Sequence, residues 1–351
     1  MVMDIQETLN NYEANTIDWH KYNLAKTHEK RLFLQLLHEL CQVIPLETPP
    51  RTGRPPISFR DLVFSAGLKL YSNYSGRKII SDLVYAKGAG YIKSIPHYNT
   101  ITDFLNCPAT YDLLQKLLTI SAMPLKELED SFSIDSSGFG SYQYERWMRV
   151  RFSKGNKRGW RNYVKGHIVI GTRTNIVCAC DVAYGNESDV SKAQSVIEKT
   201  GANFNMKEFS GDKAYSAKRI YEILEQFDTT PFIAYKKNAS DNPKGPKTWV
   251  RMYSFFKNNN ELFMKHYHKR SNVETVFSMV KMRLGEFLKC KTFDSQRSEL
   301  IMKFICHNIC CLVQEMFERG VQIDFKKCSV EYKNYKVARK LGDMYNLSDI
   351  K

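Results

Sequence analysis

The chain lacks several features that would place it in a membrane or a disulfide-rich class. No run of 18 consecutive apolar residues occurs, and residues 1–30 are polar and mixed in charge, so neither a membrane span nor a secretion signal is recognisable. The nine cysteines are an odd number and contain no C-x-x-C pair. Internal repeats and low-complexity tracts are also missing. We therefore expect reduced thiols, a cytoplasmic location and no membrane partner.

The chain has fewer acidic residues than basic residues. The 351 residues include 52 Lys and Arg against 37 Asp and Glu, which leaves a formal net charge of +15 at pH 7. Such an excess indicates a polyanionic partner, most often a nucleic acid, whose phosphates release counterions when they are neutralised. An anionic membrane surface is the alternative. The hydrophobic content of 43% is that of a globular protein, and the length allows two or three domains.

The first part of the chain is predicted to be helical. Residues 1–48 form a helical segment, residues 49–56 a basic, proline-rich linker, and residues 57–125 a series of short helices. A plain linker is favoured over an arm that lies in a DNA minor groove. Within the third segment, residues 77–105 read as helix, glycine-rich turn and helix, with Asn99 or Thr100 as the N-cap. A DNA-binding helix-turn-helix and a purely structural helical module both fit this pattern.

The pattern changes in residues 126–312, where short β-branched segments alternate with helices. Strands are predicted at residues 131–135, 163–171, 176–182, 205–212 and 231–235, and helices at residues 188–200 and 215–227. A long helix with Tyr267 follows, and residues 313–351 form a basic tail. Cys306, His307, Cys310 and Cys311 are spaced like metal ligands but lie in an apolar helical run, so core packing is favoured over zinc binding.

Four polar side chains lie on one stripe of the long helix. Tyr267, Arg270, Glu274 and Lys281 fall at roughly 0°, −60°, −20° and −40° around a helical axis. Buried charges are costly unless they are paired, so this stripe is not an ordinary core face. Apolar residues occupy the neighbouring face: Val273, Val276, Phe277, Val280 and Leu284. We expect one side of the helix to dock in a core and the other to meet a charged ligand, although a solvated amphipathic helix has the same spacing.

Two further carboxylates, Asp135 and Asp212, end predicted strands. Each has a plain alternative: Asp135 as a turn residue, Asp212 as a helix N-cap and Glu274 as a surface ion-pair partner. Competing carboxylates are found at Asp181, Glu187 and Asp189, where turn and capping roles are favoured. A sheet position is favoured for His167 over catalysis, and core packing for Trp249 over stacking on an unpaired base.

The spacing Y-(2)-R-(3)-E-(6)-K, from Tyr267 to Lys281, resembles the signature of insertion-sequence transposases with a DDE catalytic core. Three other blocks resemble the same family: residues 134–138, which contain Asp135; residues 160–167, with Trp160, Lys165 and His167; and residues 211–215, where Gly211 precedes Asp212. The resemblance covers about residues 130–310. The occurrence of all four blocks in the family's order is specific evidence for this resemblance, whereas any single block would be weak evidence.

The resemblance implies an α+β fold: a ribonuclease H-like catalytic core, with a five-stranded mixed sheet flanked by helices, preceded by an all-helical N-terminal region. It implies that Asp135 and Asp212 lie on neighbouring strands and that Glu274 projects toward both. Three converging carboxylates repel one another unless a cation lies between them, and carboxylate oxygens suit Mg²⁺ or Mn²⁺. Two such ions about 3.5–4 Å apart would hold the attacking and leaving oxygens of a phosphodiester.

The resemblance also implies that Tyr267 and Arg270 contact DNA phosphates near the cleavage point and that Lys281 holds a phosphate. The expected protein is a transposase that binds the terminal inverted repeats of an insertion sequence, cleaves at its ends and joins the 3′ ends to double-stranded target DNA. A homodimer acting on DNA at the nucleoid is expected. A metal-dependent nuclease without strand transfer and a DNA-binding protein derived from a transposase remain as alternatives.

Overall fold

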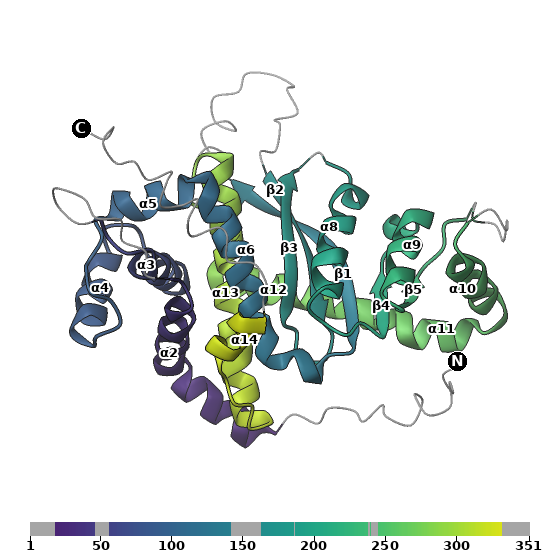
Figure 1. The fold of residues 1–351 in the computed structure, drawn as a ribbon, viewed down its shortest axis with the longest axis horizontal. Coiled ribbons are helices and arrows are strands. Elements are labelled where there is room, and N and C mark those ends of the chain that lie inside the picture. The colour runs from purple at the N-terminus through teal and green to yellow at the C-terminus, as the bar shows by residue number, and fades with distance from the viewer. Residues whose placement is uncertain are drawn as a thin grey trace.

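A computed structural model describes residues 18–45, 56–141, 163–185, 187–237, 239 and 245–331 (Figure 1). Nearly all of the predicted linker, Trp160 and the tail from residue 332 lie outside these described residues. Helices from the first third of the chain gather at one end of the molecule, and a sheet with its own helices occupies the other (Figure 1).

A mixed six-stranded sheet forms the second part of the molecule. Its strands are β1 (Ser131–Ser141), β2 (Tyr163–Gly171), β3 (Val177–Tyr184), β4 (Glu208–Gly211), β5 (Thr230–Ile233) and β6 (Phe287–Leu288). The order is β3-β2-β1-β4-β5, with β6 pairing the far end of β1. The first three strands are antiparallel, whereas β4 and β6 run parallel to β1 and β5 runs parallel to β4. The predicted ribonuclease H-like fold is confirmed, with β6 as an additional short strand.

Helices cover the sheet and build the N-terminal region. They are α2 (Trp19–Gln42), α3 (Phe59–Tyr71), α4 (Ile79–Gly88), α5 (Tyr98–Asn106), α6 (Pro108–Ala122), α8 (Asp189–Gly201), α9 (Lys218–Gln226), α10 (Lys247–Asn258), α11 (Asn260–Tyr267), α12 (Ser271–Leu284), α13 (Phe293–Glu318) and α14 (Phe325–Glu331). Three 3₁₀ turns accompany them: η1 (Met123–Leu128), η2 (Lys213–Tyr215) and η3 (His268–Arg270).

Helix α13 joins the two parts of the molecule. It packs on α2, α3, α5 and α6 from the N-terminal region and on β2 and β3 from the sheet. By length and composition it could cross a membrane, but 83% of its most apolar window is buried in the protein. Cys306 and Cys310 are buried in it, and His307 Nε2 lies 2.9 Å from the Asn175 carbonyl oxygen. The predicted boundary at residue 312 therefore falls inside this core helix.

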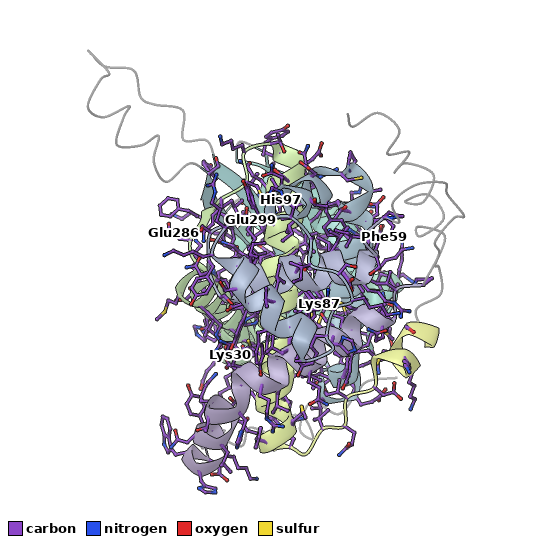
Figure 2. All side chains as sticks on the ribbon, turned by 90° about the vertical axis from the view of Figure 1, so that its left-hand side faces the viewer. Lys30, Phe59, Lys87, His97, Glu286 and Glu299 are labelled. Atoms are coloured by element: carbon purple, nitrogen blue, oxygen red, sulfur yellow. The ribbon has the colours of Figure 1, made fainter. Side chains whose placement is uncertain are left out.

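The predicted helix, turn and helix correspond to α4 and α5. The N-cap predicted at Asn99 or Thr100 is wrong, because His97 occupies that position and its ring Nδ1 accepts a hydrogen bond from the Asn99 N–H at 3.3 Å. Helix α4 packs on α3, whereas α5 packs on α13, α3 and α6. Figure 2 looks onto this end of the molecule, where Lys87 and His97 are labelled. Helix α4 lies at the outer edge of this end of the molecule (Figure 1).

The prediction of one continuous helix from Tyr267 to Lys281 is wrong. Helix α11 ends at Tyr267, and the tighter turn η3 separates it from α12. At this break Glu208, the first residue of β4, lies 2.8 Å from Lys269 Nζ and 3.1 Å from His266 Nδ1. Ser133 of β1 also donates a hydrogen bond to the Arg270 carbonyl oxygen at 3.5 Å. These contacts fix the turn to the edges of two strands.

Glu208→Gln is predicted to destabilise the protein by about 2–3 kcal/mol at pH 7. Although burial opposes ionisation, His266 and Lys269 lower the pKa of Glu208 from 4.5 to about 2. A depressed pKa means that the contribution is complete above pH 4.5 and is lost as the pH falls toward 2. Urea unfolding across this range measures it. Glu225→Gln, at an exposed position of α9, is the control, and an equal loss in both variants would contradict the prediction.

Candidate active site

Strand pairing places Asp135 next to Asp212. Parallel pairing of β1 with β4 sets Ile134 opposite Gly211. Asp135 directly follows Ile134 in the chain, and Asp212 directly follows Gly211. Gly211 is needed for this approach, because a Cβ atom there would lie 2.9 Å from Ile134 Cγ2. The two carboxylates interact electrostatically, since Asp212 raises the pKa of Asp135.

Arg270 connects the carboxylates across elements. Its Nη2 lies 2.6 Å from Glu274 Oε1 and 3.7 Å from Asp135 Oδ2. Tyr267 interacts with the same guanidinium, and its pKa is raised by burial and by the negative charges of Asp212 and Glu274. The structure thus brings Asp135, Asp212, Glu274, Tyr267 and Arg270 into one electrostatic cluster.

Lys281 of α12 contacts β1 further along that strand. Its Nζ donates a hydrogen bond to Ser137 Oγ at 2.8 Å and lies 5.1 Å from the centre of the Phe139 ring. Phe277 of α12 is also in contact with Phe139. Side chains alternate along a strand, so Asp135, Ser137 and Phe139 share the face of β1 that α12 covers. The η3–α12 segment therefore carries three of the four predicted signature residues, Arg270, Glu274 and Lys281, along β1, and Tyr267 precedes it as the last residue of α11.

Burial and repulsion shape the charge of Asp135. Burial is the largest influence and raises its pKa, and the negative charges of Asp212 and Glu274 raise it further. The Ser136 N–H, 2.7 Å from Asp135 Oδ1, and the Arg270 guanidinium act in the opposite direction. The net pKa remains above the usual 3.8. At Asp135, burial and the two neighbouring carboxylates together therefore outweigh the Arg270 guanidinium and the Ser136 N–H.

Of the alternative roles considered for the three carboxylates, only the ion pair of Glu274 agrees fully with the structure. Asp135 is no turn residue and does not end its strand, because pairing with β2 and β6 continues β1 to Ser141. Asp212 occupies the N-cap position of η2, but its side chain accepts no cap hydrogen bond. Glu274 does form an ion pair, with Arg270, and its side chain remains 57% exposed.

The neighbouring polar residues have separate roles. Glu187 accepts a turn hydrogen bond from the Tyr184 N–H at 3.1 Å, and Asp181 accepts from the Tyr111 hydroxyl at 3.0 Å. Trp249 packs against Tyr221 in the core. The predicted turn and capping roles are wrong for Asp181, which lies within β3, and for Asp189, the first residue of α8, whose carboxylate binds Ser136 and Lys165. Sequence reasoning missed Ser136 and Ser137, although they directly follow Asp135.

The chemical type of the donor atoms suits a hard divalent cation. Three carboxylates in one cluster offer the oxygen ligands that Mg²⁺ and Mn²⁺ prefer. Over the described ranges, no three His, Cys, Asp or Glu side chains already stand close enough to hold an ion. Arg270 binds two of the three carboxylates in this arrangement. A bound cation would therefore have to share these oxygens with the guanidinium or replace it.

Asp135→Asn is predicted to stabilise the fold at pH 7 without divalent metal, because burial and the neighbouring carboxylates disfavour the charge that it removes. The raised pKa means that the aspartate costs stability once the pH exceeds that pKa, so the gain should vanish below pH 3.8. Thermal unfolding in a chelator measures it. Asp130→Asn, whose side chain is 60% exposed, should have no effect. A clear destabilisation by Asp135→Asn would contradict the predicted repulsion.

Comparison with known families agrees with this geometry. The model of the family described as "Transposase DDE domain" matches residues 127–309, more than half of the chain. The match contains β1 to β6, the three carboxylates and most of α13. No curated protein and no solved structure matches the chain. The chain belongs to the transposase DDE domain family.

Proposed function

We propose that this chain is the transposase of an insertion sequence from the group with the Y-(2)-R-(3)-E-(6)-K signature. It would bind the terminal inverted repeats, cleave phosphodiester bonds at the element's ends and join the 3′ ends to target DNA. The main support is one observation: Arg270 lies between Asp135 and Glu274, and strand pairing places Asp212 beside Asp135.

Asp135, Asp212 and Glu274 would hold two Mg²⁺ or Mn²⁺ ions. When bound, such ions supply Lewis-acid activation of water and neutralise charge on the phosphodiester. Glu274 suits this role because its exposed side chain can exchange the guanidinium for a cation. The half-buried pair, Asp135 on β1 and Asp212 directly after β4, is the fixed part of the proposed site, and Glu274 is the adaptable part.

The cationic residues would then bind DNA. If Glu274 held a cation, the Arg270 fork would be available to a phosphate in a bidentate geometry. Lys281, held over Phe139 by Ser137, presents a point charge further along β1. Tyr267 would fix the orientation of Arg270 through their contact. Together, these residues would position the scissile phosphate next to Asp135.

The N-terminal helices would recognise the inverted repeats, with α4 as the principal contact. Arg77, Lys78 and Lys87 at α4 are exposed, and Tyr85 is 68% exposed beside them. Helix α5 contains no lysine or arginine and packs on α13. Lys87 and Lys30 lie on the helical face seen in Figure 2. Because two ends are joined at one target, we propose a homodimer on DNA at the nucleoid.

Glu274→Gln is predicted to abolish Mg²⁺-dependent cleavage and joining of a labelled duplex that carries the element's ends. The substitution keeps the size and removes one ligand charge, so the rate should fall by at least about a hundredfold. DNA affinity should remain within about twofold. Glu286→Gln, at an exposed glutamate just after α12, is the matched control and should stay active.

Other outcomes of that assay favour the alternatives. Cleavage without joining would indicate a nuclease that shares the same core. Tight DNA binding without cleavage under any divalent metal would indicate a DNA-binding protein derived from a transposase. Equal activity of wild type and Glu274→Gln would remove Glu274 from the proposed site.

Replacing Arg77, Lys78 and Lys87 together by alanine is predicted to weaken binding to the inverted repeats. Loss of three phosphate contacts should reduce the slope of log affinity against log salt by up to about 2.7. The matched control replaces Lys247, Arg251 and Lys257, exposed on α10 at the other end of the molecule. Fluorescence anisotropy in a salt series measures both, and identical losses would exclude α4 as the specific contact.

A further inference from the structure

A second set of polar contacts lies behind Asp135, on the other face of β1. The Ser136 N–H donates to Asp135 Oδ1 at 2.7 Å, and its hydroxyl donates to Asp189 Oδ1 at 2.6 Å. Successive strand side chains point to opposite faces of a sheet. Ser136 therefore connects the carboxylate cluster beneath α12 with the first residue of α8 on the opposite face.

Asp189 is itself held from two sides. Lys165 of β2 donates to the same Oδ1 at 3.0 Å and to the Glu187 carbonyl oxygen at 3.1 Å. Burial favours the neutral acid, but the hydrogen bonds from Ser136 and Lys165 and the Lys165 charge bring the pKa of Asp189 below its usual range. Asp189 is thus an ionised acceptor with two fixed donors, and α8 packs on β1, β2 and β3 around it.

The surroundings strengthen these bonds. His167 is paired opposite Ser136 in the sheet and is fully buried. Burial lowers the pKa of His167 to about 4, so the ring is neutral at pH 7 and adds no cation to compete with Lys165. Hydrogen bonds to a charged acceptor are stronger than those between neutral groups. The position of the Ser136 hydroxyl is therefore well defined.

We infer that Asp189 is a positioning residue for the proposed metal site, acting through Ser136 on the carboxylate of Asp135. The bond from Asp189 fixes the Ser136 residue, and the Ser136 amide fixes one oxygen of Asp135. The other oxygen, Oδ2, faces Arg270 and the neighbouring carboxylates. This inference rests on the proposed function, because it concerns how Asp135 is presented to a cation.

The test is calorimetric titration of the full chain with Mn²⁺ alone, without DNA. Asp189→Ala and Ser136→Ala should each weaken Mn²⁺ binding by about tenfold, the scale for losing a residue that orients a ligand. The double variant should be no weaker than either single one, because both remove the same connection. General destabilisation would instead produce additive losses, and thermal unfolding of each variant checks that it is folded.

Two further variants separate the possible failures. Asp181→Ala removes a carboxylate of β3 that accepts a hydrogen bond from Tyr111. Because β3 pairs with β2 and not with β1, this substitution should leave Mn²⁺ affinity unchanged. Asp135→Asn should abolish the binding. If Asp135→Asn abolishes binding while Asp189→Ala equals wild type, the inference about Asp189 is overturned and the proposed site remains. If wild type and Asp135→Asn bind alike, the proposed metal site fails, and the inference fails with it.

Discussion

Mutual repulsion among three carboxylates is the constraint on which this structure depends. Asp135, Asp212 and Glu274 come from three elements, and like charges in a partly buried place separate unless other contacts hold their backbones. Here the contacts are independent of the charges. Parallel pairing of β1 with β4 fixes the two aspartates, and the packing of Phe277 on Phe139 fixes α12 against β1. Strand pairing and core packing therefore provide the free energy that offsets the repulsion among the three carboxylates.

The helix that carries Glu274 is also tied to the N-terminal region. Arg283, near the end of α12, lies 3.4 Å from Glu29 of α2, and Lys289 donates to the Asn73 carbonyl oxygen at 2.8 Å. Between these points, the buried Lys303 donates to the carbonyl oxygens of Gly285 and Phe287 at 2.7 and 2.9 Å. A helical region that binds DNA would therefore be rigidly connected to the segment that leaves the active site.

Much of this arrangement was predictable from the sequence because strands and helices leave periodic patterns. The β-branched runs indicated β2 and β3, and the spacing from Tyr267 to Lys281 indicated which side chains share a surface. The break at η3 was not predictable, because it depends on contacts of Glu208 with His266 and Lys269, which are distant from Glu208 in the sequence. The length of β1 was missed for a similar reason: its serines and glycines favour strands weakly, and pairing with β2 and β6 extends it.

The polar contacts behind Asp135 were likewise not predictable from the sequence. The neighbours of Asp189 in the chain suggested a turn or capping role, whereas its bonds to Ser136 and Lys165 cross from α8 to two strands. A single sequence contains no local signal for such contacts. The residues of the cluster beneath α12 were identifiable because the family resemblance supplied their order and spacing.

The central proposal is that Asp135, Asp212 and Glu274 together hold the divalent cations. The most direct measurement replaces Mg²⁺ by Fe²⁺ and generates hydroxyl radicals, which cut the polypeptide close to the bound ion. Fragments should end near residues 135, 212 and 274, and excess Mg²⁺ should suppress all three cuts together. Cuts at other places, or cuts near only one of these residues, would contradict the account.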